Sequence, residues 1–156
     1  MQRIKGNLKP ASSARSSGSF SNGFNTGSFG SLVDSASLSP QLNLILKRLS
    51  KRDPVSIIKA LDDLKEILIT VNQQEIIDFL PIWPSFFNRL GLNSDKRVRE
   101  GVYACHAQLI TLAGRQLTIV LKRVIGTWMM GRFDPSIPVQ TLASDAFLVF
   151  FLVFLI

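Results

Sequence analysis

Three aspartates, each followed by an amphipathic pattern, recur along the chain at intervals of 42 and 39 residues. They are Asp53, Asp95 and Asp134, and aspartate is a favoured N-cap residue of helices. The positions seven and eight, and fourteen and fifteen, after each aspartate are mostly apolar. These positions hold Ala60/Leu61, Val102/Tyr103, Thr141/Leu142, Ile67/Leu68, Leu109/Ile110 and Leu148/Val149. The pattern predicts three equivalent helices that turn their apolar faces toward one core.

A second helical pattern precedes each of these helices, so the repeating unit is a helical hairpin. The hairpins span about 40–70, 72–114 and 115–146. We expect a kink or two segments in the second hairpin, because Pro81 and Pro84 lack a backbone N–H and clash with the preceding turn. A period of ~40–47 residues is typical of HEAT and armadillo helix pairs, and three pairs bury a continuous core. The sequence therefore predicts an all-α fold, a HEAT/armadillo-like superhelical stack of about three helical hairpins.

The third hairpin repeats the start of the first. Asp134-Pro135, like Asp53-Pro54, combines an N-cap residue with a proline suited to the first helical position. Pro138 follows within the first turns and can delay the helix until after it.

The two ends of the chain differ from the repeats in composition. Residues 1–39 are rich in Ser and Gly and have too little apolar surface to offset the entropy of ordering, so we predict a disordered basic arm. This arm either orders on a partner or stays a solvated tail, and it carries Phe20, Phe24 and Phe29. Residues 147–156 are all apolar. We expect them to be the truncated end of the last repeat helix, because a terminal repeat normally has a polar outer face.

The composition excludes several classes of site. Lys and Arg outnumber Asp and Glu by 18 to 11, a balance that favours an anionic partner such as RNA or a membrane surface. A disulfide framework or a zinc module within this chain is excluded, because Cys105 and His106 are its only cysteine and histidine. We predict that both are packed in the repeats rather than catalytic, and that Trp83 and Trp128 anchor the core.

Basic residues are the candidates for partner contact. Lys96 and Arg97 stand at the start of a helix, the less favourable end for a cation, so either repeat stacking or phosphate contact has to account for them. For Asp95 and Arg99 we favour a stacking role, in which an aspartate and an arginine pair between neighbouring repeats. The candidate contacts with a ribosome or another partner are Lys5, Lys9, Arg15, Lys47, Arg48, Lys51, Arg52, Lys96 and Arg97.

Several stretches together resemble the N-terminal region of the listerin family, large RING-type E3 ubiquitin ligases of ribosome-associated quality control. They include KGNLKPASS at 5–13, SLVD at 31–34, LKRLSKRDPVSIIKAL at 46–61, LPIWPSFFNRL at 80–90, DKRVRE at 95–100, and the segment around Gly126, Trp128 and Phe133-Asp134-Pro135. The resemblance covers most of residues 5–146 in the family's order.

The resemblance implies a cytosolic HEAT-repeat scaffold that binds stalled large ribosomal subunits and their quality-control factor, so that nascent chains are ubiquitinated. In the family a C-terminal RING, with its zinc, recruits the ubiquitin-conjugating enzyme. This chain lacks the ligands for a RING, so we expect no catalysis by it alone, no cofactor in it, and neither DNA nor a membrane as partner. The alternatives are a HEAT adaptor for protein transport or assembly and, less favoured, a small tail-anchored membrane protein.

Overall fold

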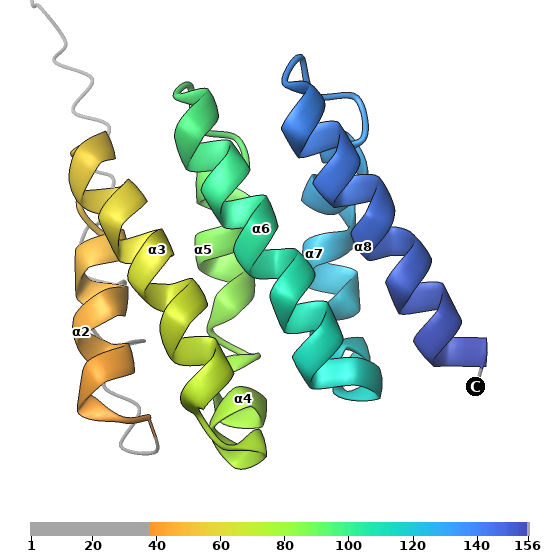
Figure 1. The fold of residues 1–156 in the computed structure, drawn as a ribbon, viewed down its shortest axis with the longest axis horizontal. Helices are drawn as coiled ribbons and strands as arrows, with labels where there is room; N and C mark the ends of the chain where they lie inside the picture. The colour runs from red at the N-terminus through yellow and green to blue at the C-terminus, as the bar shows by residue number, and fades with distance from the viewer. Residues whose placement is uncertain (1–37, 156) are drawn as a thin grey trace, which may run out of the picture.

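The computed structural model describes residues 38–155, and every regular element in that part of the chain is a helix (Figure 1). Except for its last two residues, the predicted arm lies outside this part. The elements are α2 (Pro40–Leu49), α3 (Pro54–Thr70), α4 (Gln73–Phe79), α5 (Trp83–Leu90), α6 (Lys96–Ala113), the 3-10 helix η1 (Gly114–Leu117), α7 (Thr118–Gly131) and α8 (Ile137–Leu155). The predicted all-α stack of helical hairpins is confirmed.

The helices form two layers, one behind the other in the view of Figure 1. One layer contains α3, α6 and α8, and α6 packs between the other two. The second layer contains α2, α5 and α7, each lying against the partner helix of its own hairpin. The starts of α3, α6 and α8 all lie at the same edge of the stack, the upper edge in Figure 1. We call this the turn edge, because the turn inside each hairpin lies there.

The two prolines of the second hairpin divide its first half, as expected. α4 ends at Phe79 and α5 begins at Trp83, so that Pro81 lies between the helices and Pro84 in the first turn of α5. A proline there disrupts no helical hydrogen bond, because the first N–H groups of a helix have no partner within the helix.

All three repeating aspartates accept a backbone N–H near the start of a helix. The distances are 2.9 Å from Asp53 to Ser56, 2.9 Å from Asp95 to Arg97 and 2.8 Å from Asp134 to Ser136. The pKa of each aspartate is lowered, first by a side-chain hydrogen bond from Ser56, Arg97 or Arg99, respectively, and also by the backbone bond, because both stabilise the charged carboxylate. The repeat in the sequence is therefore a repeat of helix starts.

The third helix start is delayed, as expected, but the helix begins just before Pro138 rather than after it. α8 begins at Ile137 rather than at Pro135, with Pro138 in its first turn. This delay of two residues rotates the helix relative to the aspartate. Its buried positions are Val139, Ala143, Ala146 and Phe150, whereas Leu148, expected to point inward, is 63 % exposed.

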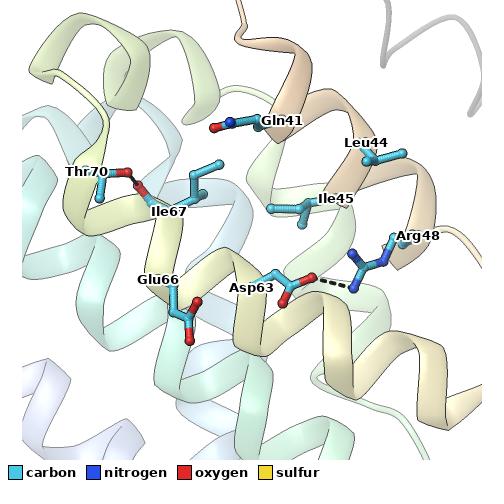
Figure 2. Close-up of a pocket in the computed structure, with 8 residues that line it drawn as sticks. All are labelled: Gln41, Leu44, Ile45, Arg48, Asp63, Glu66, Ile67 and Thr70. Carbon is cyan, nitrogen blue, oxygen red and sulfur yellow. Dashed lines mark hydrogen bonds and ion pairs between the residues drawn. The ribbon is translucent and has the colours of Figure 1, made fainter.

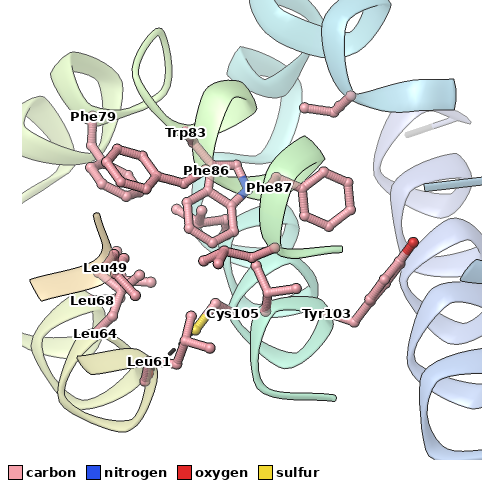
Figure 3. Packing of buried hydrophobic residues seen from close by; sticks show 14 of the residues in the cluster. Leu49, Leu61, Leu64, Leu68, Phe79, Trp83, Phe86, Phe87, Tyr103 and Cys105 are labelled. Carbon is pink, nitrogen blue, oxygen red and sulfur yellow. Dashed lines mark hydrogen bonds between the residues drawn. The ribbon is translucent and has the colours of Figure 1, made fainter. Parts of the chain in front are cut away.

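Aromatic rings form a continuous column through the middle of the stack. His106 of α6 stacks on Phe87 of α5 with ring centroids 4.0 Å apart, and it meets Trp128 of α7 edge to face at 4.8 Å. Trp83 extends the column beside Phe87, as Figure 3 shows. All four side chains are buried, so the prediction that both tryptophans anchor the core is confirmed.

The polar atoms of these side chains bond neighbouring helices. Trp83 Nε1–H donates to His106 Nδ1 at 3.2 Å, and Trp128 Nε1–H donates to the carbonyl of Ala143 in α8 at 2.9 Å. Tyr103 Oη–H donates to the carbonyl of Thr127 in α7 at 2.6 Å. Each aromatic side chain thus contributes apolar burial and one hydrogen bond that fixes the position of the next helix.

Tyr103 also requires a glycine opposite its ring. A Cβ atom on Gly131 would lie 2.3 Å from Tyr103 Cε1, far inside van der Waals contact. A Cβ atom on Gly126, in the same helix, would meet no atom within 4 Å. The two glycines of α7 therefore have different physical roles.

We expect Gly131→Ala to lower the free energy of unfolding by about 1–3 kcal/mol, because Tyr103 must move out of its packed position. Gly126→Ala is the matched control, and it should stabilise the chain by about 0.5–1 kcal/mol, the usual gain for replacing a glycine inside a helix. Urea unfolding of both variants measures the difference. Equal effects of the two substitutions would contradict the packing of Tyr103 on α7.

The buried imidazole predicts a pH dependence of stability. Burial lowers the pKa of His106 to about 3, from an ordinary 6.5, so the unfolded chain takes up a proton that the folded chain excludes. Stability should therefore be complete above pH 6.5 and fall by about 1.4 kcal/mol per pH unit from about pH 6 to pH 4.5. Urea unfolding at several pH values measures this slope.

His106→Asn is the control for this slope. The asparagine keeps an acceptor for the Trp83 N–H but cannot titrate. The variant should be less stable at every pH, and its stability should change little between about pH 6 and pH 4.5. A slope equal to that of the original chain would show that other groups cause the pH dependence.

Candidate functional site

The turn edge presents basic side chains from all three hairpins. Lys51 and Arg52 lie in the first turn, Lys96 and Arg97 at the start of α6, and Arg132 in the third turn, and all five are exposed. Figure 1 shows that these three turns share one edge of the stack. The structure thus brings together four of the basic residues that the sequence singled out.

An ion pair joins the second and third turns. Arg99 donates from Nε to Asp134 Oδ2 at 2.7 Å and from an Nη atom to Asp134 Oδ1 at 3.0 Å. The other Nη atom of Arg99 donates to the carbonyl of Asn93 at 2.9 Å. These bonds lower the pKa of the Asp134 carboxyl and raise that of the arginine. Arg99 is therefore held between repeats, and its guanidinium is occupied.

Asp95 makes a different pair from the one expected. Its carboxylate accepts from the Arg97 guanidinium at 2.8 and 3.2 Å, two positions along the same helix start. The hydrogen bonds with Arg97 lower the pKa of Asp95. The first hairpin has Ile57 at the position that corresponds to Arg99, so it offers no arginine to Asp95.

The remaining basic candidates differ in their availability. Lys96 and Lys47 are exposed and make no ion pair within the part of the chain that is described. Arg48 pairs with Asp63 at 2.6 Å across the first hairpin. Lys5, Lys9 and Arg15 lie outside the described residues.

Sequence reasoning missed the apolar residues of the turn edge. Phe133 is 83 % exposed and Ile137 is 73 % exposed, and each of the other two turns carries one exposed aliphatic side chain, Leu92 or Val55. The available signal was that these residues adjoin the hairpin turns and do not fall on the repeated apolar positions that were predicted to face the core. The turn edge is therefore both basic and apolar.

The described part of the chain offers no arrangement for catalysis or for a metal. His106 and Cys105 are buried, and burial raises the pKa of the Cys105 thiol to about 12, where it stays protonated. Its Sγ–H lies 3.4 Å from the carbonyl of Leu61. Within residues 38–155 no three His, Cys, Asp or Glu side chains are grouped as metal ligands. The turn edge is therefore the candidate site in this part of the chain.

α8 has the length and composition of a membrane-crossing helix over Ile137–Phe154, with a mean hydropathy of 1.8. This span is longer than the apolar run of residues 147–156 that stands out in the sequence. A core helix of a soluble protein passes the same test, and one face of α8 packs on α6 and α7. Its opposite face exposes Leu148, Phe151, Leu152 and Phe154.

Comparison with known proteins gives the family. The model of the N-terminal domain of E3 ubiquitin-protein ligase listerin matches residues 33–152, which is most of the chain. The chain belongs to the listerin family. Mouse listerin is 30 % identical over 94 % of this chain, and Drosophila melanogaster listerin is 31 % identical over 72 % of it. Schizosaccharomyces pombe listerin is 32 % identical over 73 % of the chain.

These relatives of the listerin family are much longer than the chain. The matches cover 9 % of the mouse protein, 6 % of the fly protein and 7 % of the fission yeast protein. No solved structure matches the chain. The family match therefore assigns this stack to the N-terminal domain of a listerin, and the turn edge is a surface of that domain.

The two arginine pairs of the turn edge should differ in their effect on stability. Arg99→Ala should lower the free energy of unfolding by about 1–2 kcal/mol, because it leaves the largely buried Asp134 carboxylate without its bidentate partner. Arg97→Ala, the control, removes an exposed guanidinium and should change stability much less. Thermal unfolding of both variants tests this difference, and equal effects would show that the pair with Asp134 does not join the repeats.

Proposed function

We propose that this chain is the N-terminal scaffold of a listerin-like E3 ubiquitin ligase and helps to hold the ligase on stalled large ribosomal subunits. The observation that carries the proposal is the exposed basic turn edge on a stack that matches the N-terminal domain of listerin. Nascent chains on those subunits would then be ubiquitinated and degraded.

Ribosomal RNA fits this edge electrostatically. Phosphates attract Lys and Arg, and each contact releases counterions, which makes binding dependent on salt. Lys51, Arg52 and Lys96 are exposed on turns of a packed stack, so their backbone positions are set before binding. Their binding therefore requires little loss of backbone entropy.

The rest of the ligase supplies the chemistry in this proposal. The ubiquitin-conjugating enzyme is recruited by a RING with its zinc elsewhere in the protein, and the complex works in the cytosol. The exposed Phe133, Leu92 and Ile137 favour an additional protein contact at the turn edge, for which the ribosome-associated quality-control factor is the candidate.

The same apolar residues favour the second candidate function, a HEAT adaptor for protein transport or assembly. An adaptor would bind its partner through apolar side chains such as Phe133, with little dependence on charge or salt. The two functions therefore predict different responses to charge reversal.

Charge reversal at the turn edge should weaken binding to ribosomes. We expect the triple variant Lys51→Glu, Arg52→Glu and Lys96→Glu to co-sediment less with large ribosomal subunits, because three attractive phosphate interactions become repulsive. The slope of log affinity against log salt should become shallower by about 0.7–0.9 for each phosphate that is no longer neutralised. Sedimentation at several salt concentrations measures both quantities.

The matched control reverses three exposed charges away from the turn edge, as Arg115→Glu, Lys122→Glu and Arg123→Glu. It has the same net charge as the test variant, so it separates a local contact from general attraction. Equally weakened binding in both variants would remove the turn edge from the proposal. If the test variant binds the subunits as well as the original chain does, and Phe133→Ser weakens that binding, the contact is apolar. That result would favour the adaptor.

A further inference from the structure

The first hairpin has a groove on its outer face that neither the fold nor the turn edge uses. Its volume is about 370 Å³, and it lies between α2 and α3 (Figure 2). Ile45 and Ile67 contribute apolar floor, and Leu44 stands at its rim with 60 % of its surface exposed. The opposite side of α3 packs on α6, so the groove faces away from the rest of the stack.

The groove is apolar in its middle and acidic along one side. Asp63 and Glu66 project from α3, and Arg48 of α2 bonds Asp63 at 2.6 Å (Figure 2). Glu66 is exposed and makes no ion pair within the described residues. A ligand that fits this surface has an apolar or aromatic side chain with basic residues nearby.

We propose that this groove binds the chain's own N-terminal segment, through one or more of Phe20, Phe24 and Phe29. The segment has the matching chemistry, since phenylalanines recur in it among small residues. Its basic residues, Arg3, Lys5, Lys9 and Arg15, all precede Phe20, and no acidic residue precedes Asp34, so the charge of the part before Phe20 complements that of Glu66 and Asp63.

The chain length permits this contact. Phe29 lies nine residues before Leu38, which is buried at the start of α2, and nine extended residues reach up to about 30 Å. Leu38 is held there because its carbonyl accepts from Asn43 Nδ2 at 3.2 Å. The groove extends from Gln41 to Arg48, a helical rise of about 10 Å. The segment can therefore turn back and occupy the whole groove.

Attachment to the same chain makes a shallow groove sufficient. A short tether gives an effective concentration of about 1 mM or more, so weak apolar contacts can keep the segment bound. A separate partner would need a larger or deeper contact for the same occupancy. This inference does not depend on ribosome binding.

Paramagnetic relaxation enhancement tests the contact on the whole chain. A spin label on Thr26→Cys should broaden the NMR signals of Leu44, Ile45 and Ile67, and Cys105 should not react because its thiol is buried and protonated. Leu44→Glu should lower the docked fraction about tenfold by placing a charge in the apolar groove. Leu148→Glu is the control, since Leu148 is similarly exposed at the opposite end of the stack.

A second variant keeps the test independent of folding. Replacing all three phenylalanines of the segment with Ser leaves the hairpins unchanged and should abolish the broadening. Broadening that persists in this variant or in the Leu44→Glu chain would overturn the proposal. Broadening that appears only between labelled and unlabelled chains, and depends on concentration, would overturn it in favour of a second copy as the occupant.

Discussion

The stack depends on aromatic side chains whose single polar atoms bond the next helix. Trp83 bonds His106, Tyr103 bonds the carbonyl of Thr127, and Trp128 bonds the carbonyl of Ala143, which links α5, α6, α7 and α8 in order. A ring alone could slide along an apolar surface, whereas a ring with a buried hydrogen bond has one low-energy position. Helices that have little sequence in common are thereby held at fixed spacing.

The fixed spacing of the helices sets the positions of the residues on the turn edge. The start of α6 is joined to the third turn by Arg99 and Asp134, and by a 2.7 Å hydrogen bond from Ser136 to Glu100. Basic and apolar side chains on such an edge are therefore attached at fixed backbone positions. The buried histidine and cysteine, by contrast, have structural roles.

Much of the fold could be predicted from the sequence, because the helix starts are marked by Asp53, Asp95 and Asp134 and are local features. The face that α8 buries could not be predicted, because it depends on whether the helix begins at Pro135 or close to Pro138. The partner of Asp95 depends on the preceding repeat, which has Ile57 where an arginine is needed. Basic residues of the edge were identifiable by type, but the exposure of Phe133 depends on how the turns stack.

Hydrogen exchange of the chain with and without large ribosomal subunits tests the central claim most directly. A preformed scaffold that binds through its turn edge predicts slower exchange of amides near residues 50–56, 91–97 and 132–137 when subunits are present. The amides of the α6 core should exchange at the same rate in both states, because the aromatic column is already packed. Protection centred on α8 or on the opposite edge, or protection spread evenly over all helices, would contradict this claim.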